Sequence, residues 1–158
     1  MNRTLIGICL FLTASVCTAQ KNEIYKKSIA SLQVVAGDDW LSPPITQLDG
    51  EPITIAFDDL THEYHRYTYT IEHCEADWST TTQLFASDYL DGFAEGNTID
   101  DVQKSINTKT LYTHYRLQIP NERCRLKMSG NYRLTVFDEN NDNEKILSAC
   151  FMVVEPLA

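Results

Sequence analysis

The 158-residue sequence is short of several residue types, and each shortage excludes a class of protein. Basic residues are outnumbered, because 13 Lys and Arg face 22 Asp and Glu and give a net charge of −9. Such an acidic surface repels the phosphates of nucleic acids and of anionic lipids. We therefore expect no nucleic-acid partner.

The motifs of several common enzyme classes are absent as well. The sequence has no Cys-x-x-Cys pair, no Gly-x-Ser-x-Gly elbow and no glycine-rich phosphate loop. These motifs carry redox chemistry, acyl transfer and nucleotide binding respectively. The pattern most similar to a metal site is His62-x-x-His65, which follows Asp58 and Asp59. This motif falls in an expected loop, where its spacing does not bring the two imidazoles together as it would on a helix face. We predict a protein that is not an enzyme, with no catalytic residues, no metal site and no cofactor.

Long apolar runs are missing after the first 20 residues, so the sequence predicts no membrane span. The start of the chain is different. Arg3 precedes an apolar run over residues 5–12, and small residues follow over residues 13–19. This order is typical of a secretory signal peptide. We predict that residues 1–19 are removed before Gln20 and that the mature protein is exported to the periplasm of a bacterium with two membranes.

Cysteine is scarce in the predicted mature chain, which keeps three of the five: Cys74, Cys124 and Cys150. Export permits a disulfide, but an odd number leaves at least one thiol unpaired within the chain. One disulfide and three buried free thiols both remain open. An alternative start, as a lipoprotein with lipid on Cys17, is disfavoured by the preceding Val16.

Strand-like alternation is the main positive signal. In residues 67–74, Tyr67, Tyr69, Ile71 and His73 share one face, and large aromatic residues at period two favour a core-facing strand. Trp78 follows directly, and we predict that it fills the core. The alternative is a ligand platform built on exposed aromatic side chains.

The same pattern recurs along the chain between turn signals. Further strands are predicted over residues 29–35, 45–48, 53–57, 99–106, 111–119, 132–136 and 146–154. The segment Ser129-Gly130-Asn131-Tyr132 resembles the corner tyrosine of immunoglobulin-like sandwiches, whose hydroxyl bonds back to the preceding turn. We predict an all-β fold, an antiparallel immunoglobulin-like β-sandwich of about eight strands. Residues 29–155 form its single domain, and residues 20–28 form a flexible leader.

The longest irregular stretch covers residues 79–96 and mixes aromatic with acidic side chains. A contact surface commonly has an aromatic centre and a charged rim. The aromatic residues alternatively serve only to pin the loop to the core. We predict that a protein partner binds here, through Phe85, Asp88, Tyr89, Asp91, Phe93 and Glu95.

With these segments placed, the chain resembles the first domain of the plug protein of the type IX secretion system of Bacteroidota. The resemblance depends on short pieces in a fixed order, which together cover nearly all of the predicted mature chain. They are Leu41-Ser42-Pro43-Pro44-Ile45, Phe57-Asp58-Asp59-Leu60, His73-Cys74-Glu75-Ala76-Asp77-Trp78, Tyr89-Leu90-Asp91-Gly92-Phe93, Ser105-Ile106-Asn107-Thr108, Tyr112-Thr113-His114-Tyr115, Ile119-Pro120-Asn121, Ser129-Gly130-Asn131-Tyr132 and Val153-Val154-Glu155.

The resemblance implies a non-enzymatic protein at the periplasmic face of the outer membrane, where it would close the translocon barrel of the secretion system. That barrel is the implied partner. Plug proteins of this family continue with further β-rich domains, whereas this sequence ends at Ala158. The alternative function is a carbohydrate-binding sandwich that uses Trp40, Tyr64, Tyr67 and Tyr112 as stacking residues.

Overall fold

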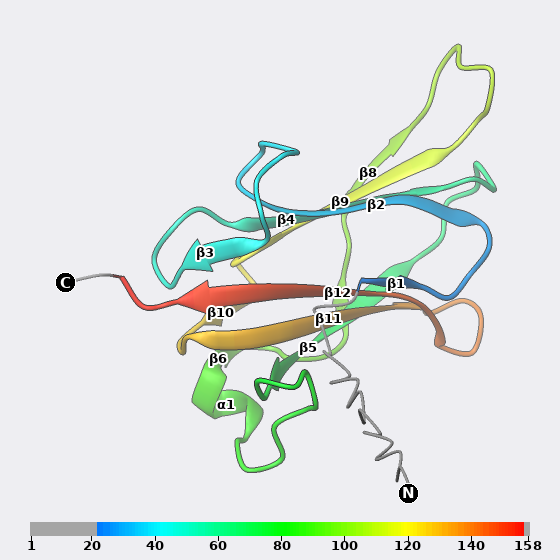
Figure 1. The fold of residues 1–158 in the computed structure, drawn as a ribbon. Helices are drawn as coiled ribbons and strands as arrows, with labels where there is room; N and C mark the ends of the chain where they lie inside the picture. The colour runs from blue at the N-terminus through cyan, green and yellow to red at the C-terminus, as the bar shows by residue number, and fades with distance from the viewer. Residues whose placement is uncertain (1–21, 157–158) are drawn as a thin grey trace, which may run out of the picture.

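The computed structural model describes residues 22–156, and the predicted signal peptide lies outside them. The described residues form twelve strands and one short helix, and ten of the strands make two facing layers (Figure 1). The all-β sandwich predicted from the sequence is therefore confirmed, with twelve strands rather than eight. No helix in residues 22–156 is both long and apolar enough to cross a membrane.

The first layer is a sheet of six strands around the long last strand. In order, the sheet contains β1 (Glu23–Ile24), β12 (Glu144–Val154), β11 (Gly130–Asp138), β5 (Tyr67–Cys74) and β7 (Asn97–Thr98). The sixth strand, β3 (Ile45–Gln47), runs parallel to the end of β12, whereas the other neighbours are antiparallel.

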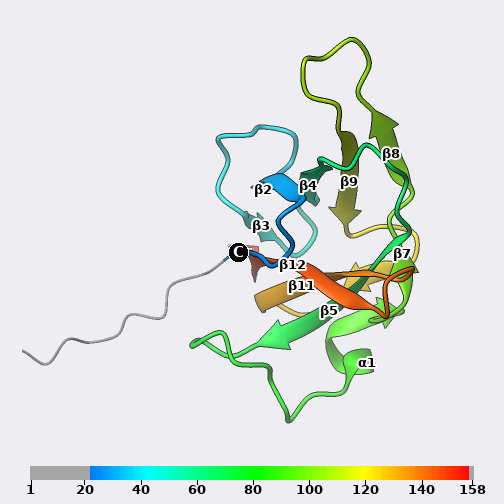
Figure 2. The ribbon, with the colours of Figure 1, turned by 90° about the vertical axis from the view of Figure 1, so that its right-hand side faces the viewer.

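The second layer has four antiparallel strands: β2 (Ile29–Ala36), β4 (Ile53–Asp59), β9 (Thr113–Ile119) and β8 (Asp101–Lys104). A separate ribbon pairs β6 (Leu90–Gly92) with β10 (Cys124–Leu126), and helix α1 (Ala86–Tyr89) directly precedes β6. Figure 2 shows the two layers nearly edge-on, with α1 and the loop before it at one end of the molecule and the β8–β9 turn at the other.

The core lies between the layers and is rich in aromatic residues. Tyr67, Tyr69 and Ile71 of β5 are buried, as their alternation predicts, and His73 is half-buried. The ring of Phe57 stacks on Tyr115, and Tyr132 stacks on Phe151. Because aromatic side chains bury large areas, these rings supply much of the burial that stabilises the sandwich.

The corner tyrosine predicted from the sequence forms its hydrogen bond. Tyr132 is fully buried, and its hydroxyl donates to the carbonyl of Met128 at 2.6 Å. Gly130 has a φ of 147°, and a Cβ there would lie 2.3 Å from Nε2 of His73. Only glycine therefore fits this turn without displacing the histidine.

Trp78 does not fill the core, so that prediction is wrong. Strand β5 ends at Cys74, and a tight turn closes with the Glu75 amide donating to the Ser79 carbonyl at 2.8 Å. Trp78 sits half-buried on this turn with a φ of 65°. Tyr132 and Phe151 are instead fully buried in the core.

The predicted flexible leader also differs from the structure in its described part, residues 22–28. Glu23 and Ile24 pair with Ser148 and Leu147 of β12. Lys26 reaches the buried carboxylate of Asp138 at 2.9 Å, which fixes the segment further. This order depends on partners more than 110 residues away, so local sequence could not reveal it.

The three cysteines in the described chain are buried, and no disulfide joins any two of them. Cys74 accepts a contact from the Arg133 guanidinium at 3.3 Å, and burial raises the pKa of the Cys124 thiol. Of the two alternatives that the sequence left open, the structure shows three buried cysteines with no disulfide among them.

Candidate functional site

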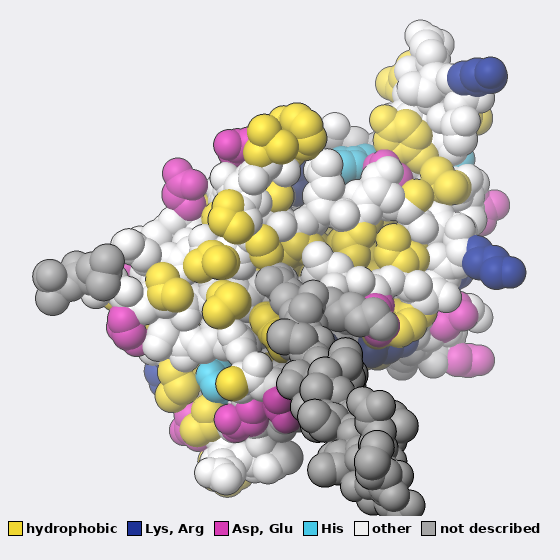
Figure 3. Space-filling model, viewed as in Figure 1, with side chains coloured by type: hydrophobic (Ala, Val, Ile, Leu, Met, Phe, Trp, Pro, Cys, Tyr) yellow, Lys and Arg dark blue, Asp and Glu magenta, His cyan; other side chains and the backbone are white. Residues whose placement is uncertain are grey.

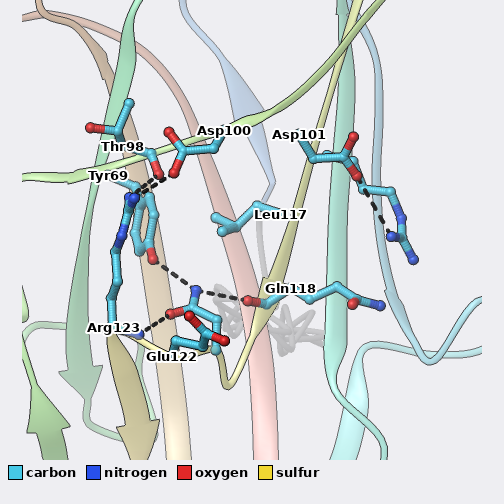
Figure 4. A pocket seen from close by; sticks show the side chains of 10 residues that line it. Tyr69, Thr98, Asp100, Asp101, Leu117, Gln118, Glu122 and Arg123 are labelled. Carbon is cyan, nitrogen blue, oxygen red and sulfur yellow. Dashed lines mark hydrogen bonds and ion pairs between the residues drawn. The ribbon is translucent and has the colours of Figure 1, made fainter.

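Three places concentrate polar or exposed aromatic side chains: a cleft between the sheets, a buried ionic cluster and the surface around α1. The cleft has a volume of about 280 Å³ and lies where the chain crosses from β7 to β8 (Figure 4). It is lined by Tyr69, Thr98, Asp100, Asp101, Arg116, Leu117, Gln118, Asn121, Glu122 and Arg123.

Both guanidinium groups in the cleft already have partners. Arg123 donates to the Thr98 carbonyl at 2.8 Å and forms an ion pair with Asp100 (Figure 4). Arg116 pairs with Asp38 and, at 3.8 Å, with Asp101. A guanidinium that is neutralised within the chain has little left to attract an anionic ligand.

The buried tyrosine below the cleft is held in the same way. Asn121 donates from Nδ2 to the Tyr69 hydroxyl at 2.9 Å and to the Gln118 carbonyl at 3.0 Å, while its Oδ1 accepts from the Arg123 amide at 2.9 Å. Burial raises the pKa of Tyr69, so its hydroxyl stays protonated. These contacts tie the loop after β9 to the core, and we interpret the cleft as structural.

The ionic cluster lies at the end of the sandwich where β4, β5 and β11 meet. His65 places Nδ1 3.3 Å from Asp138 and Nε2 3.7 Å from Asp59, and both carboxylates are almost completely buried. The Tyr67 hydroxyl donates to Asp59 at 2.7 Å. Lys26 adds a positive charge beside Asp138. The cluster therefore joins both sheets through charge-assisted hydrogen bonds.

The two histidines of the His62-x-x-His65 motif point to different partners. His62 contacts the Tyr112 carbonyl through Nδ1 at 3.2 Å, whereas His65 lies between the two buried carboxylates. Within residues 22–156 no group of three or more His, Cys, Asp or Glu side chains is arranged to hold a metal ion. The motif that came closest to a metal site in the sequence does not converge on one.

Five of the six residues predicted to bind a partner lie on the surface around α1. Phe85 and Phe93 are strongly exposed, at 79% and 71%, and Asp88, Asp91 and Glu95 are exposed as well. We call these five residues the α1 rim. The sixth residue, Tyr89, is only 8% exposed and packs against His73 and Tyr132. It anchors the segment and does not form part of the surface.

Backbone contacts fix the α1 rim from both ends. The Phe85 amide donates to the Asp88 carboxylate at 2.8 Å, and the Asp88 amide donates to the Phe85 carbonyl at 2.9 Å. The Phe93 amide donates to the Arg123 carbonyl at 3.0 Å, and Asn97 donates from Nδ2 to the Phe93 carbonyl at 2.7 Å. The two exposed phenylalanines are thus held by a preformed backbone, which lowers the entropy that a partner must overcome.

Comparison with known proteins places the chain in a family. A model described as the type 9 secretion system plug protein 1st domain matches residues 29–155. The chain belongs to this family. The match confirms the resemblance that the ordered sequence pieces indicated, and it covers both the α1 rim and the cleft.

A solved structure supports the fold of this plug-protein first domain. The crystal structure of a hypothetical protein from Parabacteroides merdae ATCC 43184 is 43% identical to this chain, with a TM-score of 0.81. The match covers 87% of this chain but 34% of that one, so the chain spans about a third of its length. No curated protein matches the sequence.

The aromatic residues suggested for carbohydrate binding do not form one surface set. Tyr67 is completely buried and its hydroxyl is bonded to Asp59, so it cannot stack on a sugar. Trp40 is exposed in the loop between β2 and β3, and Tyr64 is exposed in the loop between β4 and β5. Tyr112 is half-buried just before β9. The structure therefore gives the carbohydrate alternative no support.

Proposed function

We propose that this domain binds the periplasmic side of the outer-membrane translocon barrel of the type IX secretion system, as part of the plug that closes it. The main support for this proposal is that the chain belongs to the plug-protein first-domain family. The domain acts as a rigid binding body, without catalysis and without a cofactor. The predicted signal peptide supports an exported protein in the periplasm.

The α1 rim is the proposed contact surface. Exposed aromatic side chains on a rigid backbone are typical centres of protein interfaces, and the carboxylates of Asp88, Asp91 and Glu95 supply a polar edge. Asp88 also bonds the Phe85 amide, so its replacement would disturb the turn itself. The residues to test are therefore Phe85, Phe93, Asp91 and Glu95.

The experiment measures binding of the mature chain to the purified translocon barrel in detergent. Phe85→Ser and Phe93→Ser remove exposed side chains and should leave the fold intact, because neither belongs to the core. We expect each to weaken binding about tenfold, as truncation of an interface anchor does. Leu41→Ser is the matched control, since Leu41 is 72% exposed on another loop.

Two results would count against the proposal in different ways. If the unaltered chain does not bind the barrel, the plug function is wrong. If the unaltered chain binds and both phenylalanine variants bind equally well, the partner stands but the α1 rim is not the contact. The variant with Asp91→Lys and Glu95→Lys then tests whether charge at this surface matters at all.

A further inference from the structure

The turn between β8 and β9 projects from the body of the domain as a narrow arm. Figures 1 and 2 show residues 105–112 standing clear of both sheets. Ile106 is 80% exposed and Leu111 is 47% exposed. Hydrophobic side chains also line the arm in the space-filling view, with a basic side chain near its end (Figure 3). Contiguous exposed apolar side chains often mark contact surfaces on proteins.

Hydrogen bonds give the arm a defined shape. At its base, the Ser105 amide donates to the Tyr112 carbonyl at 2.9 Å, and the Tyr112 amide donates to the Ser105 hydroxyl at 2.9 Å. Nearer the end, the Thr108 hydroxyl donates to the Thr110 carbonyl at 2.7 Å, and Asn107 adopts a φ of 58°.

The loop before β5 braces the arm from the side. His62 contacts the Tyr112 carbonyl at 3.2 Å, and the Thr113 hydroxyl donates to the Glu63 carbonyl at 3.0 Å. The arm is therefore a preformed hairpin, with little ordering entropy to lose when it is bound.

The charge of the arm is opposite to that of the whole domain. Residues 102–121 contain no Asp or Glu, although the sequence has 22 of them in 158 residues. Lys104 and Lys109 are exposed, and neither forms an ion pair with another described residue. Arg116 in the same stretch is neutralised by Asp38 and Asp101. The stretch that contains the arm is thus net positive in an otherwise acidic domain.

We propose that the arm is a second contact surface, which inserts Ile106 and Leu111 into an apolar groove with an acidic rim on the translocon barrel. Complementary charge would steer Lys104 and Lys109 to that rim, and burial of the two aliphatic side chains would slow dissociation. This inference rests on the proposed function and adds to it the chemistry of the partner surface.

Two other occupants fit the observations less well. A second copy of this chain offers acidic surface, but docking the arm of one copy on the body of the next is a head-to-tail contact, which forms open chains unless its rotation closes a ring. Two lysines give only a weak attraction to an anionic membrane, and stable anchoring needs a larger apolar or basic surface. A protein groove satisfies both the charge and the shape.

The test measures the affinity of the mature chain for the purified barrel across a range of salt concentrations. Lys109→Glu should weaken binding about tenfold at low salt and reduce its dependence on salt. Ile106→Ser should weaken binding about tenfold at every salt concentration. Lys27→Glu is the matched control, because Lys27 is an exposed lysine remote in sequence from the arm, and it should leave affinity within about twofold.

The outcomes separate this inference from the proposed function. If the unaltered chain binds the barrel and both arm variants bind as tightly, the arm is not a contact while the plug function stands. If the unaltered chain does not bind, both proposals fail. If the arm variants bind the barrel normally but lose binding to phosphatidylglycerol vesicles, the arm contacts a membrane and the inference is wrong. If they bind the barrel normally but lose self-association in sedimentation, the arm contacts a second copy and the inference is likewise wrong. Circular dichroism of each variant confirms that it is folded.

Discussion

Removal of a single hydroxyl group from the buried ionic cluster tests the structural account most directly. Tyr67→Phe deletes the donor that bonds Asp59 at 2.7 Å and leaves the ring in place. Both residues are completely buried, so water cannot readily replace the lost contact. A hydrogen bond to a charged group contributes about 1.5–3 kcal/mol, and an unsatisfied buried carboxylate oxygen costs free energy of similar size.

We therefore expect Tyr67→Phe to lower the free energy of unfolding by about 2 kcal/mol. In a domain of this size that change lowers Tm by roughly 4–8 °C. Urea denaturation followed by circular dichroism measures the free energy, and calorimetry measures Tm. Tyr25→Phe is the control, since Tyr25 is 45% exposed and donates to Glu23 on the surface. Its effect should stay within about 0.5 kcal/mol.

A double-mutant cycle shows whether the effect comes from this hydrogen bond. In the unaltered protein, the two carboxylate oxygens of Asp59 accept hydrogen bonds from the Tyr67 hydroxyl at 2.7 Å and from the Thr61 amide at 3.0 Å. Asp59→Asn replaces one of these oxygens with an amide nitrogen, so one of the two donors loses its acceptor. Tyr67→Phe should then cost less in the Asp59→Asn background, with a coupling of about 1–2 kcal/mol. Additive effects of the two changes, or a Tyr67→Phe variant as stable as the Tyr25 control, would refute the reasoning.

Three further predictions concern other parts of the fold. Gly92→Ala should destabilise the domain by about 1–2 kcal/mol more than Gly96→Ala in urea denaturation. Both glycines have positive φ, but only at Gly92 would a Cβ meet backbone, 2.1 Å from the Arg123 carbonyl oxygen. Equal costs of the two changes would contradict this prediction. Trp78→Ala should lower the free energy of unfolding by only about 1–2 kcal/mol, whereas Phe151→Ala in the core should lower it by about 3–5 kcal/mol. If calorimetry ranks the two variants in the opposite order, Trp78 is a core residue after all. Burial raises the pKa of Tyr67, Tyr69 and Tyr132 and raises that of Tyr115 from 10.0 to about 12. Because the folded state keeps these protons longer than the unfolded state, the stability should be intact below pH 10 and fall as the pH rises from 10 to 12. Urea midpoints that stay constant across this window, with tyrosinate absorbance already complete, would argue against it.

The long strands could be predicted from sequence because their residues alternate. Tyr67, Tyr69 and Ile71 of β5, and Tyr115 and Leu117 of β9, are buried as period two requires. Strands of two to four residues, such as β1, β6, β7 and β10, carry too few residues for a periodic signal. Pairing with distant segments determines them instead, as when Leu90 of β6 pairs with Leu126 of β10.

One predicted strand is shorter in the structure, and the chain changes sheets just before it. Residues 99–106 were expected to form a single strand, but only Asp101–Lys104 do so, as β8, which pairs with β9. Just before them, β7 pairs with β5 in the other sheet. Ile99 is buried, whereas Ile106 stands exposed on the arm. The apolar character of these residues could not by itself distinguish a core position from an exposed one.

The candidate site was predicted in part. The sequence placed the aromatic and acidic residues of the α1 rim in one segment, but their orientation depends on the β6–β10 ribbon, which buries Tyr89 and leaves Phe85 and Phe93 outside. The arm was missed, although a signal existed in the sequence. The run without carboxylates over residues 102–121 stands out in so acidic a chain.

The position of β12 gives the domain a particular response to mechanical load. The last strand does not lie at an edge, because β11 pairs along one side of it while β1 and β3 share the other. A force applied beyond residue 155, along the strand, would act on many hydrogen bonds at once in shear. A strand at a sheet edge could instead be peeled away one bond at a time. The same arrangement anchors β1 and β3, so tension at the end of the domain is shared with its first strands before the core is exposed.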